Sequence, residues 1–437
     1  MKKLFILLLV LVSGDLHAAP RIQHWTTSNG ARVYFFPAKT LPMMDLRVVF
    51  DAGAARDGDK HGLALLTNGM LAEGAGKWST GQIAERFDGV GAEFSNSAMR
   101  DMSILSLRSL TQKDLLNTAL ETFKVVLTQP NFPQDAFERE RKRLLISLES
   151  EKESPGDVTQ RAFYKELYPG HPYGHMPDGD VNSIQSITTD DMKAFYKKYF
   201  VAKNAVVALV GDLTRQQAET MVENIFSQLP SGDAAPKLPE VNSLAKAKTV
   251  EIPFPSTQTH IMVGQPGIQR GDPDYFPLYV GNYVLGGGGL VSILSDEIRE
   301  KRGLVYTSYS YFIPMHVQGP FILGLQTRNS AAQEALKVLH DVLDKYVKDG
   351  PTPAQLEAAK KNLTGGFALR IASNKKIVAN LASIGFYNLP LDYLDNYISN
   401  INSVTLDQVK DAFKRRIHPD KMLTVIVGDT TQKTSQR

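Results

Sequence analysis

The segment TTDDMKAFYKKYFVAKNAVVALVGD at residues 188–212 returns in altered form as TLDQVKDAFKRRIHPDKMLTVIVGD at residues 405–429. Each copy begins with threonine, continues with apolar residues at helical spacing, and ends in an apolar run followed by Gly-Asp. This pattern predicts a capped amphipathic helix leading into a buried strand and a turn. Both copies keep one offset of 217 residues (405 minus 188), which indicates a duplicated domain.

Other segments repeat more loosely. An apolar helical stripe over Lys113–Leu127 and a charged helix from Gln134 have counterparts in Ala332–Val347 and in a helix from Ala354. Strand-like runs occur at Leu46–Phe50, Met102–Leu107 and Phe321–Leu325. Because strands and helices do not alternate in a regular βαβ rhythm, we expect an α+β fold. It should contain two homologous tandem domains, each a mostly antiparallel sheet packed by helices.

The two repeats meet in a segment of linker composition. Leu229–Val241 contains three prolines together with serine, glycine, aspartate and alanine, which is typical of a connector. We therefore expect an N-terminal domain at 19–229, a linker at 230–245 and a C-terminal domain at 246–437.

The N-terminus has the features of a signal peptide. Lys2-Lys3 precedes the apolar run Leu4–Val12, and small residues follow at Ala18 and Ala19. A run of nine apolar residues is too short to span a bilayer, which needs about 20. A buried first strand is the alternative, but the run contains no polar residues in alternation with the apolar ones. We expect residues 1–18 to be cleaved after Ala18, and the protein to be periplasmic or secreted, without a membrane span.

Composition excludes several classes of function. The chain has 437 residues, of which 43% are hydrophobic and 22% charged, and it contains no cysteine. Disulfides, thiolate zinc sites, iron–sulfur clusters and a cysteine nucleophile are therefore impossible. The formal charge of +3 gives no reason to expect nucleic-acid binding, because proteins that bind nucleic acid usually have a basic face.

Four local patterns carry a family resemblance. The first is HGLALLTNGML at residues 61–71, and the second is Leu167–Gly174 with its His-Pro-Tyr-Gly end. The third is the doubled Val-Gly-Asp strand end, and the fourth combines Leu285–Gly289 with Ile298–Tyr306. Together they resemble the pitrilysin/insulinase superfamily of zinc peptidases, whose mitochondrial processing peptidases and short bacterial members contain two such repeats. The resemblance covers nearly the whole mature chain.

The chain departs from this family at the zinc motif. Catalytic members place two histidines at i and i+4 on one helix face, with a glutamate between them as general base. The matching positions here are Leu65, Asn68 and Gly69. Leucine and glycine offer no lone pair to a metal, and an asparagine amide is a poor base. The zinc motif is therefore degenerate.

The third zinc ligand of the family is a glutamate on the following long helix. Alignment places this position near Ser147, with Glu149 and Glu140 close by. One or two carboxylates cannot rebuild a nitrogen-rich tetrahedral site once both histidines are gone. We therefore expect no metal in this chain and no peptide hydrolysis by the chain alone.

Histidines outside the motif are weak candidates for metal ligands. His171 and His175 have i, i+4 spacing, but Pro172 and Gly174 between them forbid a regular helix. We expect a loop or turn there. His61 stands at a predicted helix start among charged residues, and it is an equally weak candidate for a metal ligand.

The second repeat keeps a pair of residues that the resemblance connects with catalysis. In active relatives an arginine and a tyrosine seven residues apart reach into the zinc site, hold the substrate backbone and stabilise the oxyanion. Arg299 and Tyr306 have that spacing. Seven residues at about 100° come to roughly 700°, so a helix would put both on one face, although Gly303 is expected to end it. Outside such a family motif, an arginine and a tyrosine at this spacing would be interpreted as a solvated arginine and a packed tyrosine.

A run of four glycines resembles the glycine-rich loop that lines the family's substrate chamber. Its members are Gly286, Gly287, Gly288 and Gly289. The evidence for a phosphate-binding loop is weak, because the run follows a helical pattern and no Lys-Ser/Thr comes after it. A flexible connector is the alternative.

These observations favour a non-catalytic subunit of an exported heteromeric zinc peptidase. A homologous partner with the H-x-x-E-H motif would hold the zinc and cleave peptides, while this chain contributes Arg299 and Tyr306. The alternative is a peptide-binding or scaffold protein with no proteolytic role. A peptidase with a relocated metal site is the third hypothesis, and stoichiometric zinc in the purified chain would support it.

Overall fold

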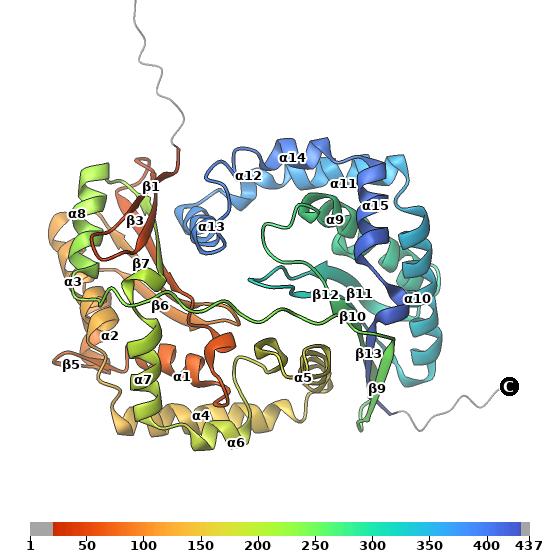
Figure 1. The fold of residues 1–437 in the computed structure, drawn as a ribbon, viewed down its shortest axis with the longest axis horizontal. Coiled ribbons are helices and arrows are strands. Elements are labelled where there is room, and N and C mark those ends of the chain that lie inside the picture. The colour runs from red at the N-terminus through yellow and green to blue at the C-terminus, as the bar shows by residue number, and fades with distance from the viewer. Residues whose placement is uncertain (1–20, 430–437) are drawn as a thin grey trace, which may run out of the picture.

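Two halves lie side by side in the computed structural model, which describes residues 21–429 (Figure 1). The predicted signal peptide and the cleavage site after Ala18 lie outside these residues. An extended segment crosses from the first half to the second between helix α8 (Arg215–Phe226) and strand β9 (Lys248–Pro253). The predicted linker, 230–245, falls within this segment.

The first half is built on a mixed sheet, which has six strands within the described residues, in the order β1-β2-β8-β3-β7-β6. The β2–β8 pair is parallel, and the other pairs are antiparallel. The strands are β1 (Gln23–Thr26), β2 (Arg32–Pro37), β3 (Met43–Phe50), β6 (Glu93–Ala98), β7 (Ser103–Leu110) and β8 (Ala205–Gly211). A short hairpin, β4 (Gly74–Ala75) with β5 (Trp78–Ser79), stands apart from this sheet.

The sheet of the second half has the order β11-β12-β10-β13-β9 over the same described range. Its β13–β9 pair is parallel and the rest are antiparallel. Besides β9, its strands are β10 (Gln258–Pro266), β11 (Val305–Phe312), β12 (Pro320–Arg328) and β13 (Leu423–Gly428). Read as β9-β13-β10-β12-β11, the order matches β2-β8-β3-β7-β6 strand for strand. The predicted α+β duplication is confirmed.

The repeated segment forms the same helix–strand unit in both halves. Helix α7 (Thr189–Tyr199) begins with a capping box in which Thr188 and Asp191 exchange hydrogen bonds. Helix α15 (Leu406–Arg416) begins with the equivalent box of Thr405 and Gln408. Each box satisfies N–H groups that a helix start leaves unpaired. The strands that follow, β8 and β13, are buried along their whole length.

Helices of each half cover one face of its own sheet, with core clusters spanning both elements. In the first half the helices are α1 (Leu63–Met70), α2 (Thr80–Asp88), α3 (Lys113–Thr128), α4 (Gln134–Glu151), α6 (Val181–Ser186), α7 and α8. In the second half they are α9 (Tyr275–Asn282), α10 (Ala332–Asp349), α11 (Pro353–Gly365), α12 (Phe367–Arg370), α14 (Tyr397–Ser403) and α15. No helix among residues 21–429 has the length and apolarity needed to cross a membrane.

Each half contributes one helix that packs on the sheet of the other half. Helix α5 (Pro155–Leu167) of the first half packs on β10 and β13 of the second. Helix α13 (Asn374–Phe386) of the second half packs on β2, β3 and β8 of the first (Figure 1). Phe163 on α5 and Leu381 on α13 are fully buried in these two mixed cores. Each sheet is therefore completed by a helix from the other half.

Candidate functional site

Helix α1 carries the degenerate zinc motif and is held at its start by Asp57. This carboxylate accepts hydrogen bonds of 2.7 Å from the backbone N–H groups of Gly62 and Ala64, which no intrahelical carbonyl can pair. The carboxylate also lies 3.2 Å from Nε2 of His175. Burial raises the pKa of Asp57, and its hydrogen bond with His175 opposes the rise.

The three motif positions lack zinc-binding chemistry. Leu65 is half-buried, and Gly69 is exposed beside open space. Asn68 is buried, and its Nδ2 donates to the carbonyl of Ile104 on β7 at 3.3 Å, so its amide anchors α1 to the sheet. Throughout residues 21–429, no group of three or more metal-ligating side chains is placed to hold an ion. The residues present do not fit a resident zinc.

The carboxylates predicted near the third ligand position form local ion pairs on α4. Ser147 is exposed, and Glu149 pairs with Lys152 at 2.7 Å. Glu140 pairs with Arg143 on the following turn. Pairs at this spacing stabilise a helix by a few tenths of a kcal/mol, roughly 0.2–0.5. The pairs do not compensate for the missing histidines of α1.

A cluster of charges that the sequence did not reveal lies next to Leu65. Arg161 on α5 pairs with both Glu151 and Asp178 and donates to the carbonyl of Gly179 at 2.7 Å. Leu65, Glu151, Arg161 and Asp178 line a cavity of about 320 Å³. Burial is the main cause that raises the pKa of Asp178 to about 6, while Arg161 lowers it and Glu151 raises it further.

This raised pKa predicts a pH-dependent contribution to stability. The folded chain binds more protons than the unfolded chain, so the stabilising contribution of Asp178 is present below its ordinary pKa of about 4 and lost as pH rises through 6. Asp178→Asn removes this titration. The free energy of unfolding of Asp178→Asn, relative to wild type, should rise by about 1–2 kcal/mol between pH 4.5 and 7.5, a value reduced for partial exposure. Urea denaturation at both pH values measures it, with the exposed pair member Glu149→Gln as control. Parallel pH dependences of wild type and Asp178→Asn would contradict the assignment.

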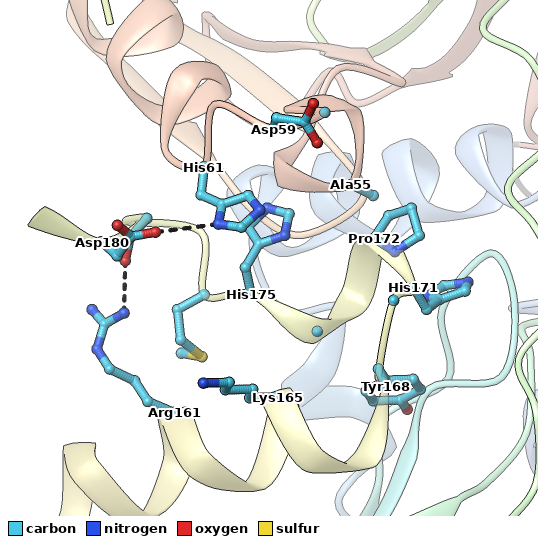
Figure 2. A pocket seen from close by; sticks show the side chains of 15 residues that line it. Ala55, Asp59, His61, Arg161, Lys165, Tyr168, His171, Pro172, His175 and Asp180 are labelled. Carbon is cyan, nitrogen blue, oxygen red and sulfur yellow. Dashed lines mark hydrogen bonds and ion pairs between the residues drawn. The ribbon is translucent and has the colours of Figure 1, made fainter. Parts of the chain in front are cut away.

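Three histidines line a second, larger cavity of about 730 Å³ next to α1 (Figure 2). The rings of His61 and His175 stack with centroids 4.0 Å apart and planes 8° apart. Nδ1 of His61 lies 3.3 Å from Oδ2 of Asp180, the residue that caps α6. Besides Asp57, His175 therefore contacts the ring of His61, which is 114 residues away in sequence (175 minus 61).

The loop predicted between His171 and His175 is present as a single 3-10 turn, Pro172–Gly174. Nδ1 of His171 accepts from the backbone N–H of Tyr173 at 3.0 Å, and its Nε2 lies 3.1 Å from the carbonyl of Pro239. Both ring nitrogens are therefore engaged with the backbone. Burial lowers the pKa of His171.

Arg299 and Tyr306 lie together, but the predicted helical geometry is wrong. Arg299 lies in a π-helical turn, Ser295–Glu300, and the chain then reverses at Gly303, where φ is +59°. Tyr306 is the extra residue of a bulge between Val305 and Thr307 of β11. A bulge redirects the side chain that it inserts. Cζ of Arg299 lies 5.3 Å from the centre of the Tyr306 ring, whose residue is 82% exposed.

The four glycines divide into a packed part and an open part. Gly286 is buried where a Cβ would collide with Ser310 of β11. The turn is fixed there by Asn282, whose Nδ2 donates to the carbonyl of Ser310 at 2.9 Å and whose Oδ1 accepts from its hydroxyl at 2.7 Å. Gly289 has φ +63° and open space beside it. A substrate-binding role for Gly286, Gly287, Gly288 and Gly289 stays a prediction.

Fold and site together define a class: a two-repeat chain of the zinc-peptidase type that lacks donor residues in its own metal motif. The comparisons with known proteins agree. Residues 38–176 match the profile of the insulinase family (peptidase family M16), and residues 186–363 match the profile of the peptidase M16 inactive domain. The chain belongs to the insulinase family.

Individual relatives match this chain over most of its length. A crystal structure of a peptidase M16 inactive domain from Pseudomonas fluorescens is 44% identical, with a TM-score of 0.91, and the match covers 95% of this chain and 99% of that one. The non-peptidase homolog YmxG of Helicobacter pylori is 26% identical over 98% of this chain and 99% of its own length. An uncharacterized zinc protease of Streptomyces coelicolor is 26% identical over 84% of this chain and 81% of its own length.

Proposed function

We propose that this chain is the non-catalytic subunit of an exported zinc peptidase. A homologous partner with the H-x-x-E-H motif holds the zinc ion, and this chain supplies Arg299 and Tyr306 to the partner's site. One observation carries the proposal: the motif on α1 has no donor at Leu65 or Gly69, whereas Arg299 and Tyr306 lie together, with Arg299 half-buried and Tyr306 exposed. The basic and apolar start of the chain supports export to the periplasm or medium.

The chemistry of the pair suits an oxyanion. A guanidinium offers fixed donors that stay charged at all physiological pH values, and a phenol donates one further hydrogen bond. Both groups lie at the surface, where a partner's bound peptide can reach them. Arg299 lies 3.6 Å from the carboxylate of the adjacent Glu300. That ion pair is partly open to solvent and long, and therefore weak, so Arg299 can exchange it for the substrate oxygen.

The test is peptide cleavage by a reconstituted complex. We expect Arg299→Ala to lower kcat/KM of the complex about 100-fold or more, the typical cost of losing one oxyanion donor. Tyr306→Phe should give a smaller loss, because it removes one donor and keeps the ring. The control is Arg302→Ala, whose guanidinium pairs with Glu297 at 2.7 Å.

Two outcomes would contradict the proposal. Full activity of the Arg299→Ala complex would exclude a shared site. Peptide binding by the isolated chain, without complex formation with an H-x-x-E-H homologue, would favour the binding or scaffold function. Zinc analysis of the isolated chain addresses the remaining hypothesis, because a relocated metal site requires about one zinc per chain.

A further inference from the structure

Arg270 is a cation without an anionic partner in the second half. It follows β10 and is half-buried, and its Nε is buried and makes no hydrogen bond. Within residues 21–429, no carboxylate oxygen lies within ion-pair distance (4.0 Å) of its nitrogens. Its Cζ lies 5.4 Å from the centre of the Tyr387 ring. A partly desolvated guanidinium without a counter-ion is costly.

The groups around Arg270 do not neutralise it. Burial raises the pKa of Tyr275, of Tyr387 and of Tyr393, so all three phenols are uncharged at neutral pH. Two of the nearby acids are engaged elsewhere. Asp272 accepts from Arg416 at 3.0 Å, and Asp274 accepts two hydrogen bonds from Arg415.

Arg270 lines a cavity of about 230 Å³ with mostly apolar walls. Its apolar and aromatic lining side chains are Pro273, Tyr275, Phe276, Leu389, Pro390 and Tyr393. Sites for drug-sized ligands occupy about 300–1,000 Å³, so this cavity has room for one large side chain and its attached carboxylate. The one acid at its rim without an ion pair, Asp392, is exposed and accepts from Asn396 at 2.8 Å.

We propose that this cavity binds the C-terminal residue of a peptide ending in an aromatic or large aliphatic side chain. The α-carboxylate would pair with Arg270, and the side chain would lie among the rings. A charge-assisted hydrogen bond to a partly desolvated guanidinium is among the stronger polar contacts, and aromatic pairs add further attraction. The site uses neither Arg299, Tyr306 nor a zinc-bearing partner, so it stands independently of the proposed function.

Calorimetry on the isolated full-length chain tests the site with three probes. They are N-acetyl-phenylalanine, its amide N-acetyl-phenylalaninamide, and free phenylalanine. We expect N-acetyl-phenylalanine to bind at least 10-fold more tightly than the amide, which lacks the charge. Arg270→Met should remove this preference, whereas Arg328→Met, at an exposed arginine on β12, should keep it.

Equal affinity for the acid and the amide would overturn the proposal. Binding of free phenylalanine alone would also overturn it, because an amino-acid site, with Asp392 meeting the ammonium group, would then replace a peptide-end site. If Arg270→Met does not fold, the acid-against-amide comparison on the wild-type chain decides the question by itself.

Discussion

Replacing Phe163 with alanine is expected to lower the free energy of unfolding by about 3–5 kcal/mol, the usual cost of removing a buried phenylalanine ring. Phe163 belongs to the first half by sequence, but it is fully buried in the core that α5 forms with β10 and β13. A Cβ built on Gly264 of β10 would lie 2.8 Å from Cζ of the Phe163 ring. The strand therefore packs directly on the ring, and the cavity cannot easily collapse.

The same substitution tests whether the two halves unfold together. Both tryptophans of the chain, Trp25 and Trp78, lie in the first half, whereas Phe163 contacts the second. If the exchanged helices couple the halves, tryptophan fluorescence and far-UV circular dichroism will report one transition at a lower urea concentration. Leu381→Ala on α13 should act similarly, by about 2–5 kcal/mol.

A matched control is Ile146→Ala on α4, where the side chain is 62% exposed and little stability should be lost. An unchanged tryptophan transition in Phe163→Ala, with a separate circular dichroism transition for the second half, would contradict coupling through the exchanged helices.

The sequence predicted the repeat well because hydrophobic periodicity and capping are local. The helix expected from Gln134 begins there, and the buried strands after the two threonine-capped helices are β8 and β13. The exchange of α5 and α13 could not be predicted in this way. An amphipathic pattern identifies the apolar face of a helix, but it does not say which sheet that face will cover.

The candidate site could be predicted only where the type of a single residue decides the chemistry. Leu65 and Gly69 cannot bind zinc in any conformation. The His61–His175 stack and the Arg161 cluster depend on loops that meet in space, and no spacing in the sequence indicates them. Tyr306 reaches Arg299 through a turn and a bulge, so the helical-wheel argument predicted their proximity for the wrong reason.

Asp101→Ala is expected to lower the free energy of unfolding by about 3–5 kcal/mol, as removal of one member of a buried charged network does. Asp101 lies in the β6–β7 turn and is 3% exposed. It accepts hydrogen bonds from Tyr173 Oη at 2.6 Å, from Tyr387 Oη at 3.1 Å and from the backbone N–H of His316 at 2.9 Å. Its removal leaves three donors without their acceptor.

Two of these donors come from the second half. His316 lies between β11 and β12, the counterparts of β6 and β7, so equivalent loops of the two repeats meet at Asp101. The neighbouring Arg100 is also buried; burial lowers its pKa, and the charge of Asp101 opposes this. Loss of Asp101 therefore also removes a compensating charge from a buried guanidinium.

Three variants separate this network from a general loss of stability. Tyr387→Phe removes one donor and its hydrogen bond and should cost about 1 kcal/mol, while Asp59→Ala, at an exposed aspartate, should cost almost nothing. Asp101→Ala combined with Tyr387→Phe should cost less than the sum of the two, because both break the same contact. Urea denaturation measures all three. The hydrogen bonds of Asp101 would not stabilise the contact between the halves if the two substitutions lowered the free energy of unfolding additively. A decrease below 1 kcal/mol for Asp101→Ala would lead to the same conclusion.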